Sequence, residues 1–235
     1  MYYPLYFDST MIILIPAMIL TMYAQGKISS AYSKFSRIRT ASGYTGMQTA
    51  RYILDSNGLS SVRIELVSGK LSDHYDPRTR VLRLSNDVYY GTTIAASSIA
   101  AHEVGHAIQH ANAYVPLKFR NSLVPVVNLA SNLAWVFIFA GMFFAAMPSL
   151  FTIGVIMFSA SVLFQIITLP VELNASSRAI KMLGETGILS PSEIPQGRRM
   201  LNAAALTYLA AAAAAVSQLI RLLALRDRKK KKKNN

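Results

Sequence analysis

The hydrophobic residues of this chain gather in long uninterrupted runs. Residues Ser9 to Gly26 carry no charged side chain, and Asp8 and Lys27 bound the run. About 18 to 20 apolar residues suffice to cross a bilayer, so residues 1–26 are predicted to form an N-terminal transmembrane anchor. No basic residue precedes the run and no A-x-A site follows it, which argues against a cleaved signal peptide.

Two further apolar segments follow later in the chain. From Asn121 to Val171 no residue is charged, and Met147-Pro148-Ser149 interrupts the run near its middle. Each part is long enough to cross the hydrocarbon core, so residues 123–171 are predicted to form a transmembrane helical hairpin. Leu201 to Ile220 is uncharged and rich in alanine, the strongest helix former. Segment 201–225 is therefore predicted to be a helix, and its crossing of the membrane stays open.

Residues 27–122 form the only stretch with the pattern of an aqueous domain. Val62 to Val67 alternates with the period of a strand, and Asp76-Pro77-Arg78 predicts a turn. A second short strand is expected over Arg80 to Ser85. Two helices are predicted as well: one begins after Thr45 and ends at Gly58, and the other begins at Gly91-Thr92-Thr93 and reaches about His110.

Composition narrows the classes of protein. Hydrophobic residues make up 52% of the chain and charged residues 15%, against about 25% charged in a typical soluble domain. There is no cysteine, which excludes disulfides, thiolate metal sites and cysteine nucleophiles. A metal site must therefore use histidine and carboxylate ligands.

The net charge of +13 favours a membrane over a nucleic acid as partner. The basic residues flank apolar runs or lie in Lys229 to Lys233, and no aromatic residue interleaves with that terminal run. The polybasic tail, 226–235, is expected to attract anionic lipids, although a solvated tail without a partner fits equally well.

The second predicted helix carries the chemistry, in the sequence His102-Glu103-Val104-Gly105-His106. Residues four apart lie on one face of a helix, so both imidazoles can reach one zinc ion. Glu103 lies beside them, where a carboxylate can take a proton from a water activated by the metal. This HExxH pattern predicts His102 and His106 as metal ligands and Glu103 as the general base.

Elimination indicates the third ligand. His110 is eight residues from His102, well off the ligand face of the same helix, and no glycine or proline breaks the helix before it. The first acidic residue after the motif is Glu172, at the end of the apolar hairpin. A carboxylate there is costly unless it is paired or bound to a metal.

Topology supports Glu172, because two membrane crossings return the chain to the side of the two histidines. An ion pair between Glu172 and Arg178 is the alternative, and Glu185, Glu193 and Asp227 are weaker ligand candidates. Segment 172–200 is expected to hold the third-ligand helix and a loop.

Four stretches of the chain together resemble the YugP-like neutral zinc metallopeptidases of bacterial membranes. They are Asp73 to Arg78, Leu84 to Gly91, Ala101 to His110 and Ala203 to Tyr208. The order of HExxH motif, membrane hairpin and late glutamate is also similar to the HtpX-type membrane peptidases, in which that glutamate opens an E-x-x-x-D pattern and ligates zinc. Glu172 matches the glutamate, but Ser176 stands at the position of the aspartate.

Substrate-contacting groups are harder to assign. The strand Arg80 to Ser85 could be a sheet edge that pairs with an extended substrate, or ordinary sheet structure. His74, Tyr75, Tyr89 and Tyr90 are the polar groups available to stabilise an oxyanion. Among these we favour His74 as the catalytic group, because it lies in a turn before that strand, although a structural hydrogen bond in that turn fits better.

The sequence therefore predicts a mainly α, membrane-embedded protein with a zincin-like HExxH helix, a small β-sheet and a transmembrane hairpin. The expected function is a multi-pass zinc endopeptidase that holds one Zn²⁺ ion and cleaves membrane-associated or misfolded proteins. Basic residues after the first span and around the hairpin place the catalytic region in the cytoplasm, whereas the polylysine tail complicates this orientation. The alternative is a non-catalytic membrane scaffold with a structural metal site.

Overall fold

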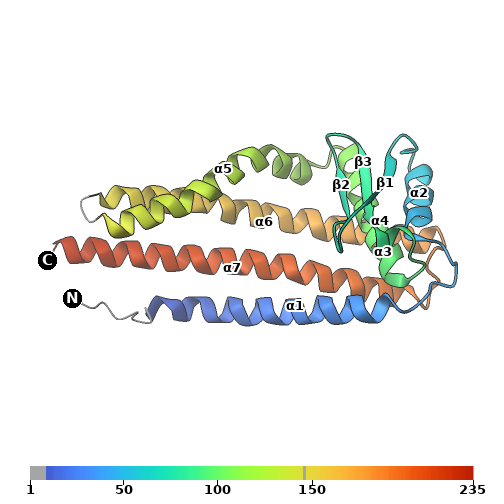
Figure 1. Cartoon of the computed structure of the whole chain (residues 1–235), viewed down its shortest axis with the longest axis horizontal. Helices are drawn as coiled ribbons and strands as arrows, with labels where there is room; N and C mark the ends of the chain where they lie inside the picture. Colours follow the sequence, from blue (N-terminus) through green and yellow to red (C-terminus); the bar gives the residue numbers. More distant parts are fainter. Residues whose placement is uncertain (1–8, 145–146, 235) are drawn as a thin grey trace. The chain divides into compact units, whose positions relative to one another are not determined.

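Helices dominate the fold, as the sequence predicts. The computed structural model describes residues 9–144 and 147–234, and Figure 1 shows its elements along the chain. The helices are η1 (Ser9–Leu14), α1 (Ile15–Phe35), α2 (Gly46–Ser56), α3 (Asn86–Tyr89), α4 (Ile94–Ala111), α5 (Val115–Phe143), α6 (Pro148–Glu185) and α7 (Ile194–Asn234). The strands are β1 (Arg63–Val67), β2 (His74–Asp76) and β3 (Val81–Ser85).

Four helical segments are long and apolar enough to cross a membrane. They are Ser9–Phe35, Val115–Phe143, Ser149–Glu185 and Ile194–Arg228. The first corresponds to the expected anchor, of which residues 1–8 lie outside the described part of the chain. The last contains the alanine-rich segment, which is helical as predicted and continues through α7 to Asn234. These candidate spans agree with the predicted mainly α, membrane-embedded fold.

The described structure divides into two compact units. Residues 1–23, 119–169 and 208–235 belong to one, which we call the helical unit. Residues 24–118 and 170–207 belong to the other, which we call the sheet unit. Helix α6 contributes to both units, because the division falls between Leu169 and Pro170.

In the helical unit, α5 and α6 form the predicted hairpin. Helix α5 ends at Phe143 and α6 begins at Pro148, so the interruption lies where the sequence placed it. The hydroxyls of Ser131 and Ser161 are 2.6 Å apart. Nearer the turn, Gly154 lies directly against the backbone of Ile138, so the two helices run antiparallel.

The sheet unit contains a three-stranded sheet in the order β1-β3-β2. Strand β1 pairs with β3 in parallel, and β2 pairs with β3 in the antiparallel direction. The two predicted strands are confirmed, and because β3 is central, the second of the two alternatives for Arg80 to Ser85 holds: it is ordinary sheet structure and not an edge. A third strand, β2, covers that edge. Its three residues are too few to show a periodic pattern in the sequence.

The two faces of the sheet differ in chemistry. On one face Arg83 forms ion pairs with Glu65 and Asp76, at 3.3 Å and 3.6 Å. On the other, Leu82 and Leu84 are fully buried and belong to the same apolar core as residues of α2, α4 and α6. The sheet therefore covers α4 with its apolar face.

Candidate metal centre

Helix α4 carries the HExxH motif and begins where the sequence predicts. The side chain of Thr93 caps it by accepting a hydrogen bond from the Ala96 N–H, at 3.2 Å. Small and apolar residues around the motif pack into the core of the sheet unit: Ala100, Ala101, Val104, Ala107 and Ile108 are buried. The helix is thereby held firmly, with His102 and His106 on one face.

Gly105 lets α6 approach α4 closely. A Cβ atom at Gly105 would lie 2.7 Å from the carbonyl oxygen of Ala175 and 3.2 Å from its Cα. Backbone atoms cannot move away as the tip of a flexible side chain can, so glycine is required at this crossing. The contact brings the turn of α6 that contains Glu172 against the two histidines. In the HExxH pattern Gly105 is only one of the two variable positions, so the motif does not predict this contact.

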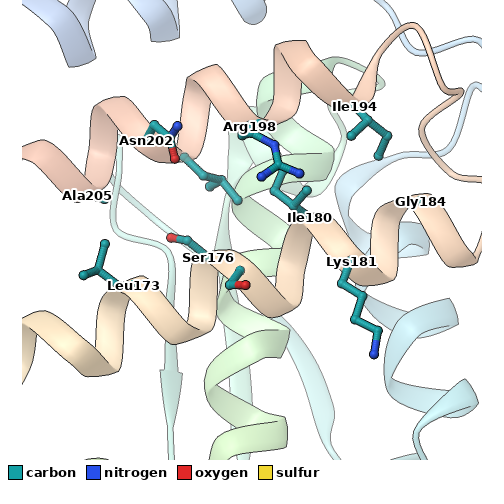
Figure 2. A pocket seen from close by; sticks show the side chains of 11 residues that line it. Leu173, Ser176, Ile180, Lys181, Gly184, Ile194, Arg198, Asn202 and Ala205 are labelled. Carbon is teal, nitrogen blue, oxygen red and sulfur yellow. The ribbon is translucent and has the colours of Figure 1, made fainter.

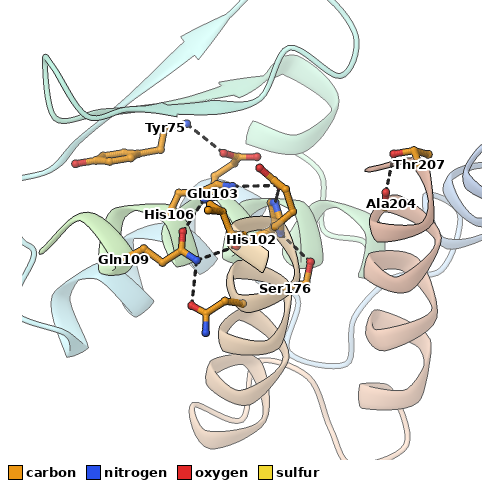
Figure 3. A network of polar contacts seen from close by, with 11 residues as sticks. Tyr75, His102, Glu103, His106, Gln109, Ser176, Ala204 and Thr207 are labelled. Carbon is orange, nitrogen blue, oxygen red and sulfur yellow. Dashed lines mark hydrogen bonds and ion pairs between the residues drawn. The ribbon is translucent and has the colours of Figure 1, made fainter. Parts of the chain in front are cut away.

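The three predicted ligands converge on one point, and Figure 3 shows two of them, His102 and His106, next to each other. One carboxylate oxygen of Glu172, Oε2, lies 3.2 Å from His102 Nε2 and 3.5 Å from His106 Nε2. The three possible ligand atoms all lie within 4.8 Å of one another. Glu172 is buried, with 3% of its surface exposed. Such a carboxylate needs a cationic partner or a metal.

Gln109, which sequence analysis did not single out, connects His106 to α6. It is fully buried, and its Oε1 lies 3.0 Å from His106 Nδ1. Its Nε2 donates to the Val171 carbonyl at 2.8 Å and to Asn174 Oδ1 at 3.0 Å. The available signal was a polar residue three positions after His106, close to one helical turn further along the helix that carries the motif.

Ser176 occupies a comparable position behind His102. Its Oγ lies 3.1 Å from His102 Nδ1, and the side chain is buried. The departure from the E-x-x-x-D pattern therefore preserves a hydrogen-bonding group at this position. A hydroxyl replaces the carboxylate that the HtpX-type resemblance implies.

Glu103 lies between the histidines and the sheet. Its Oε2 accepts a hydrogen bond from the backbone N–H of Tyr75 in β2, at 3.1 Å. Burial raises the pKa of Glu103 above its ordinary value, although the neighbouring His102 and His106 oppose the shift. Burial also lowers the pKa of His106, but hydrogen bonding to Glu172 and the charge of Glu103 outweigh it, so that pKa is raised.

The remaining histidines lie outside this group. His110 Nδ1 is 2.9 Å from the Tyr75 hydroxyl, in agreement with its predicted exclusion as a ligand. His74 is exposed, and its Nδ1–H donates to the Ser72 carbonyl at 2.8 Å. Because side chains alternate along a strand, His74 lies on the charged face of β2, opposite to Tyr75. Its position does not support the expected oxyanion role.

The weaker acidic candidates have other partners. Glu193 accepts hydrogen bonds from the backbone N–H groups of Ala41 and Ser190, both at 2.8 Å. Glu185 pairs with Lys181, and Asp227 with Arg226. Within the described residues, the group that can hold a metal consists of His102, His106 and Glu172.

The donor set fits zinc. Two imidazole nitrogens and one carboxylate oxygen are ligands that zinc accepts, and three protein ligands leave a fourth position for water or substrate. The hydrogen bonds at both Nδ1 atoms leave both Nε2 atoms directed at Glu172. Partners of this kind commonly orient metal-binding histidines.

Comparison with known proteins agrees with this geometry. The family model described as putative neutral zinc metallopeptidase matches residues 10–227. A relative from Bacillus subtilis, named putative membrane protease YugP, is 47% identical over 211 residues, which cover 90% of this chain and 93% of the relative. No solved structure matches the chain. With the match over nearly its whole length, this chain belongs to the putative neutral zinc metallopeptidase family.

Proposed function

We propose that this protein is a zinc-dependent endopeptidase of the membrane, with His102, His106 and Glu172 as ligands of one zinc ion and Glu103 as general base. The observation that carries the proposal is the convergence of the three ligand atoms within 4.8 Å of one another, beside the half-buried carboxylate of Glu103, which has no ligand role. Bound zinc would supply a Lewis acid that lowers the pKa of water and polarises a peptide carbonyl.

Gln109 fixes the hydrogen position on His106. The Val171 carbonyl can only accept, so the amide nitrogen of Gln109 must face it. The amide oxygen then faces His106 Nδ1, and it can only accept the Nδ1 proton. A neutral His106 consequently keeps the lone pair on Nε2, which is the atom directed at Glu172.

Ser176 supports His102 less rigidly. A hydroxyl can donate or accept, so Ser176 allows either neutral tautomer of His102. Accepting the Nδ1 proton frees Nε2 as a ligand. The two histidines are thus supported by one fixed and one adjustable partner.

Glu103 is suited to move a proton. Its pKa is raised by burial, and a base is most effective when its pKa is close to the working pH. We infer that its carboxylate takes a proton from the attacking water and delivers it to the leaving amine. The Tyr75 N–H holds the carboxylate in place through Oε2.

The substrate strand is reassigned to β2. In an antiparallel pair the N–H and C=O of one residue point to the same side. Because the Tyr75 N–H points to Glu103, the Tyr75 carbonyl also points away from β3, along the free edge of the sheet. We propose that an extended segment of a membrane-associated or misfolded protein pairs with this edge, beside Glu103.

The orientation proposed for the protein is a cytoplasmic catalytic region. Lys27, Lys34, Arg37 and Arg39 follow the first candidate span, as cytoplasmic flanks do. We also propose that the basic run at Lys229 to Lys233 attracts anionic lipids.

The rival function, a scaffold with a structural metal site, leaves Glu103 without a role. Structural zinc sites are usually closed by four protein ligands, and three converge here. Two substitutions separate the alternatives. Glu103→Gln preserves size and all three ligands, so zinc should stay bound while peptide cleavage falls by about 10²-fold to 10⁴-fold. Glu172→Gln replaces a ligand by an amide and should release zinc.

Both variants are measured as full-length protein in detergent, by zinc content and by cleavage of a fluorogenic peptide with and without a chelator. Wild-type cleavage by Glu103→Gln would refute the general-base role. Loss of zinc from Glu103→Gln would make that residue structural.

A further inference from the structure

A groove of about 450 Å³ lies between α6 and α7 in the sheet unit. Figure 2 shows the two helices that form its walls and the side chains that line it. Its apolar lining consists of Leu173, Ile180, Ile194, Leu201 and Ala205. The volume is within the range of sites that hold small ligands or large side chains.

The groove is positively charged. Lys181 and Arg198 line it together with Ser176, Ser177 and Asn202, whereas no acidic residue belongs to the lining. Lys181 is paired with Glu185 at 3.7 Å. Arg198 forms no hydrogen bond or ion pair within the described part of the chain, and Figure 2 shows its guanidinium directed across the groove toward Ile180. A guanidinium in this position is suited to bind a carboxylate through two hydrogen bonds.

Ser176 connects this groove to the metal centre. Its side chain lines the groove, and its Oγ contacts His102 Nδ1. Ile180, which lies opposite Arg198, is one helical turn beyond Ser176 on α6, a rise of roughly 6 Å along the helix axis. An extended peptide advances about 3.3 Å per residue. Two residues of an extended substrate therefore cover the distance from Ser176, beside His102, to the part of the groove that Arg198 and Ile180 line.

We propose that the groove is a substrate subsite that selects an acidic side chain, with Arg198 as the residue that determines specificity. The proposal rests on the endopeptidase function and adds the class of substrate. An anionic lipid headgroup carries a similar charge, but the wall shared with the metal centre favours a segment of the substrate.

The test measures binding, so that it does not depend on turnover. Full-length Glu103→Gln protein in detergent with zinc is titrated with three fluorescent peptides that differ only by Glu, Gln or Lys at one position near the cleavable bond, and each position is scanned in turn. One charge-assisted contact corresponds to about tenfold in affinity. We expect the Glu peptide to bind about tenfold more tightly than the Lys peptide at one of the positions.

Variants at Arg198 should change this preference. Arg198→Glu should reverse the preference for the Glu peptide. Arg198→Gln should remove the preference, and it provides the test if Arg198→Glu does not fold. Arg199→Glu is the matched control, because Arg198 and Arg199 are both exposed on α7 but only Arg198 lines the groove. It should keep the preference for Glu.

Each other outcome overturns the subsite. Equal binding of all peptides, absence of binding, or a preference that survives Arg198→Gln contradicts it. So does displacement of the Glu peptide by short-chain phosphatidylglycerol but not by phosphatidylcholine, which would assign the groove to a lipid. If the wild-type protein cleaves peptides in a zinc-dependent way but no charge preference is found, the endopeptidase function stands and the subsite fails. If a charge preference is found but the wild-type protein does not cleave, the binding site stands and the endopeptidase function fails.

Discussion

The two halves of α6 have opposite surroundings although they form one continuous helix. From Pro148 to Leu169 the exposed large side chains are apolar: Ile153, Ile156, Leu163 and Ile166. From Pro170 to Glu185 the helix instead carries the polar groups that build the metal centre. These groups are Glu172, Asn174 and Ser176, with Arg178 donating to Asn174 Oδ1 at 2.8 Å.

Both halves nevertheless pack by the same means, a close approach at glycine. Gly154 admits the backbone of Ile138 in the first half, and Gly105 admits the backbone of Ala175 in the second. Close approach is characteristic of helices in membranes, where small residues at the interface replace the hydrophobic effect. The two contacts therefore differ in role. The contact at Gly154 holds the α5–α6 hairpin together, and the contact at Gly105 positions the metal ligand Glu172.

Alanine substitutions at the two glycines should give the largest changes in stability and zinc affinity, and they test whether the two contacts have different roles. At Gly154 a Cβ would lie 2.7 Å from the Ile138 nitrogen, and at Gly105 2.7 Å from the Ala175 oxygen. Each substitution should lower the free energy of unfolding by about 1–3 kcal/mol, because neither backbone can move away freely. Only Gly105→Ala should also lower zinc affinity, since it displaces Glu172.

Gly184→Ala is the matched control on α6. The nearest atom to its Cβ would be 3.4 Å away, at the end of Ile194, so the helix should be unchanged or gain up to about 1 kcal/mol. Unfolding in mixed detergent and zinc titration measure the two quantities. Equal loss of zinc affinity in Gly154→Ala and Gly105→Ala would contradict the separation of roles.

Gln109→Met should produce the second largest effect, confined to the metal centre. It keeps the volume of the side chain but removes the acceptor for His106 and both donors to α6. Loss of a partner behind a metal ligand typically lowers metal affinity by about 10-fold to 100-fold. Competition with a fluorescent zinc chelator measures this change.

Nitrogen NMR of the zinc-free protein distinguishes positioning from general destabilisation. In the wild type we expect neutral His106 to carry its proton on Nδ1, and in Gln109→Met to populate both tautomers. Gln109→Glu retains an acceptor for that proton while losing the donors, so it should keep the Nδ1–H tautomer. Retention of a single tautomer in Gln109→Met would refute the positioning role.

The sequence indicated most of the fold because local signals determine it. The charge-free runs predicted the helices, and Thr45 and Thr93 marked helix starts that the structure confirms. Glu172 could be selected because no acidic residue lies between Val104 and Val171. Because acidic residues are so scarce in this part of the chain, excluding the other positions was enough to select Glu172 without knowing that it contacts His102 and His106.

Contacts between distant segments could not be predicted in this way. Gln109 donates a hydrogen bond to the Val171 carbonyl, 62 residues away in the sequence. Neither the local residue pattern nor the composition indicates that these two residues are in contact. The short strand β2 was missed for a related reason, because only pairing with β3 defines it. His74 was favoured because it lies close, along the chain, to the candidate substrate strand Arg80 to Ser85, whereas strand alternation directs it away from Glu103.

The smallest expected effect concerns the hydroxyl pair of the hairpin, Ser131 and Ser161. Their 2.6 Å contact is a polar interaction between α5 and α6 in the half of α6 whose exposed large side chains are apolar. Such bonds contribute only about 0.6 kcal/mol on average in membrane proteins, because the separated helices find other partners. A double-mutant cycle of Ser131→Ala and Ser161→Ala should give a coupling of that size.

Ser159→Ala is the control, since its hydroxyl donates to the Val155 carbonyl of its own helix and should not couple to Ser131. Zinc affinity should stay unchanged in all of these variants. A coupling well above about 1.7 kcal/mol, or a change in zinc affinity, would show that polar contacts organise the first half of α6 as they do the second, and the contrast between the two halves would fail.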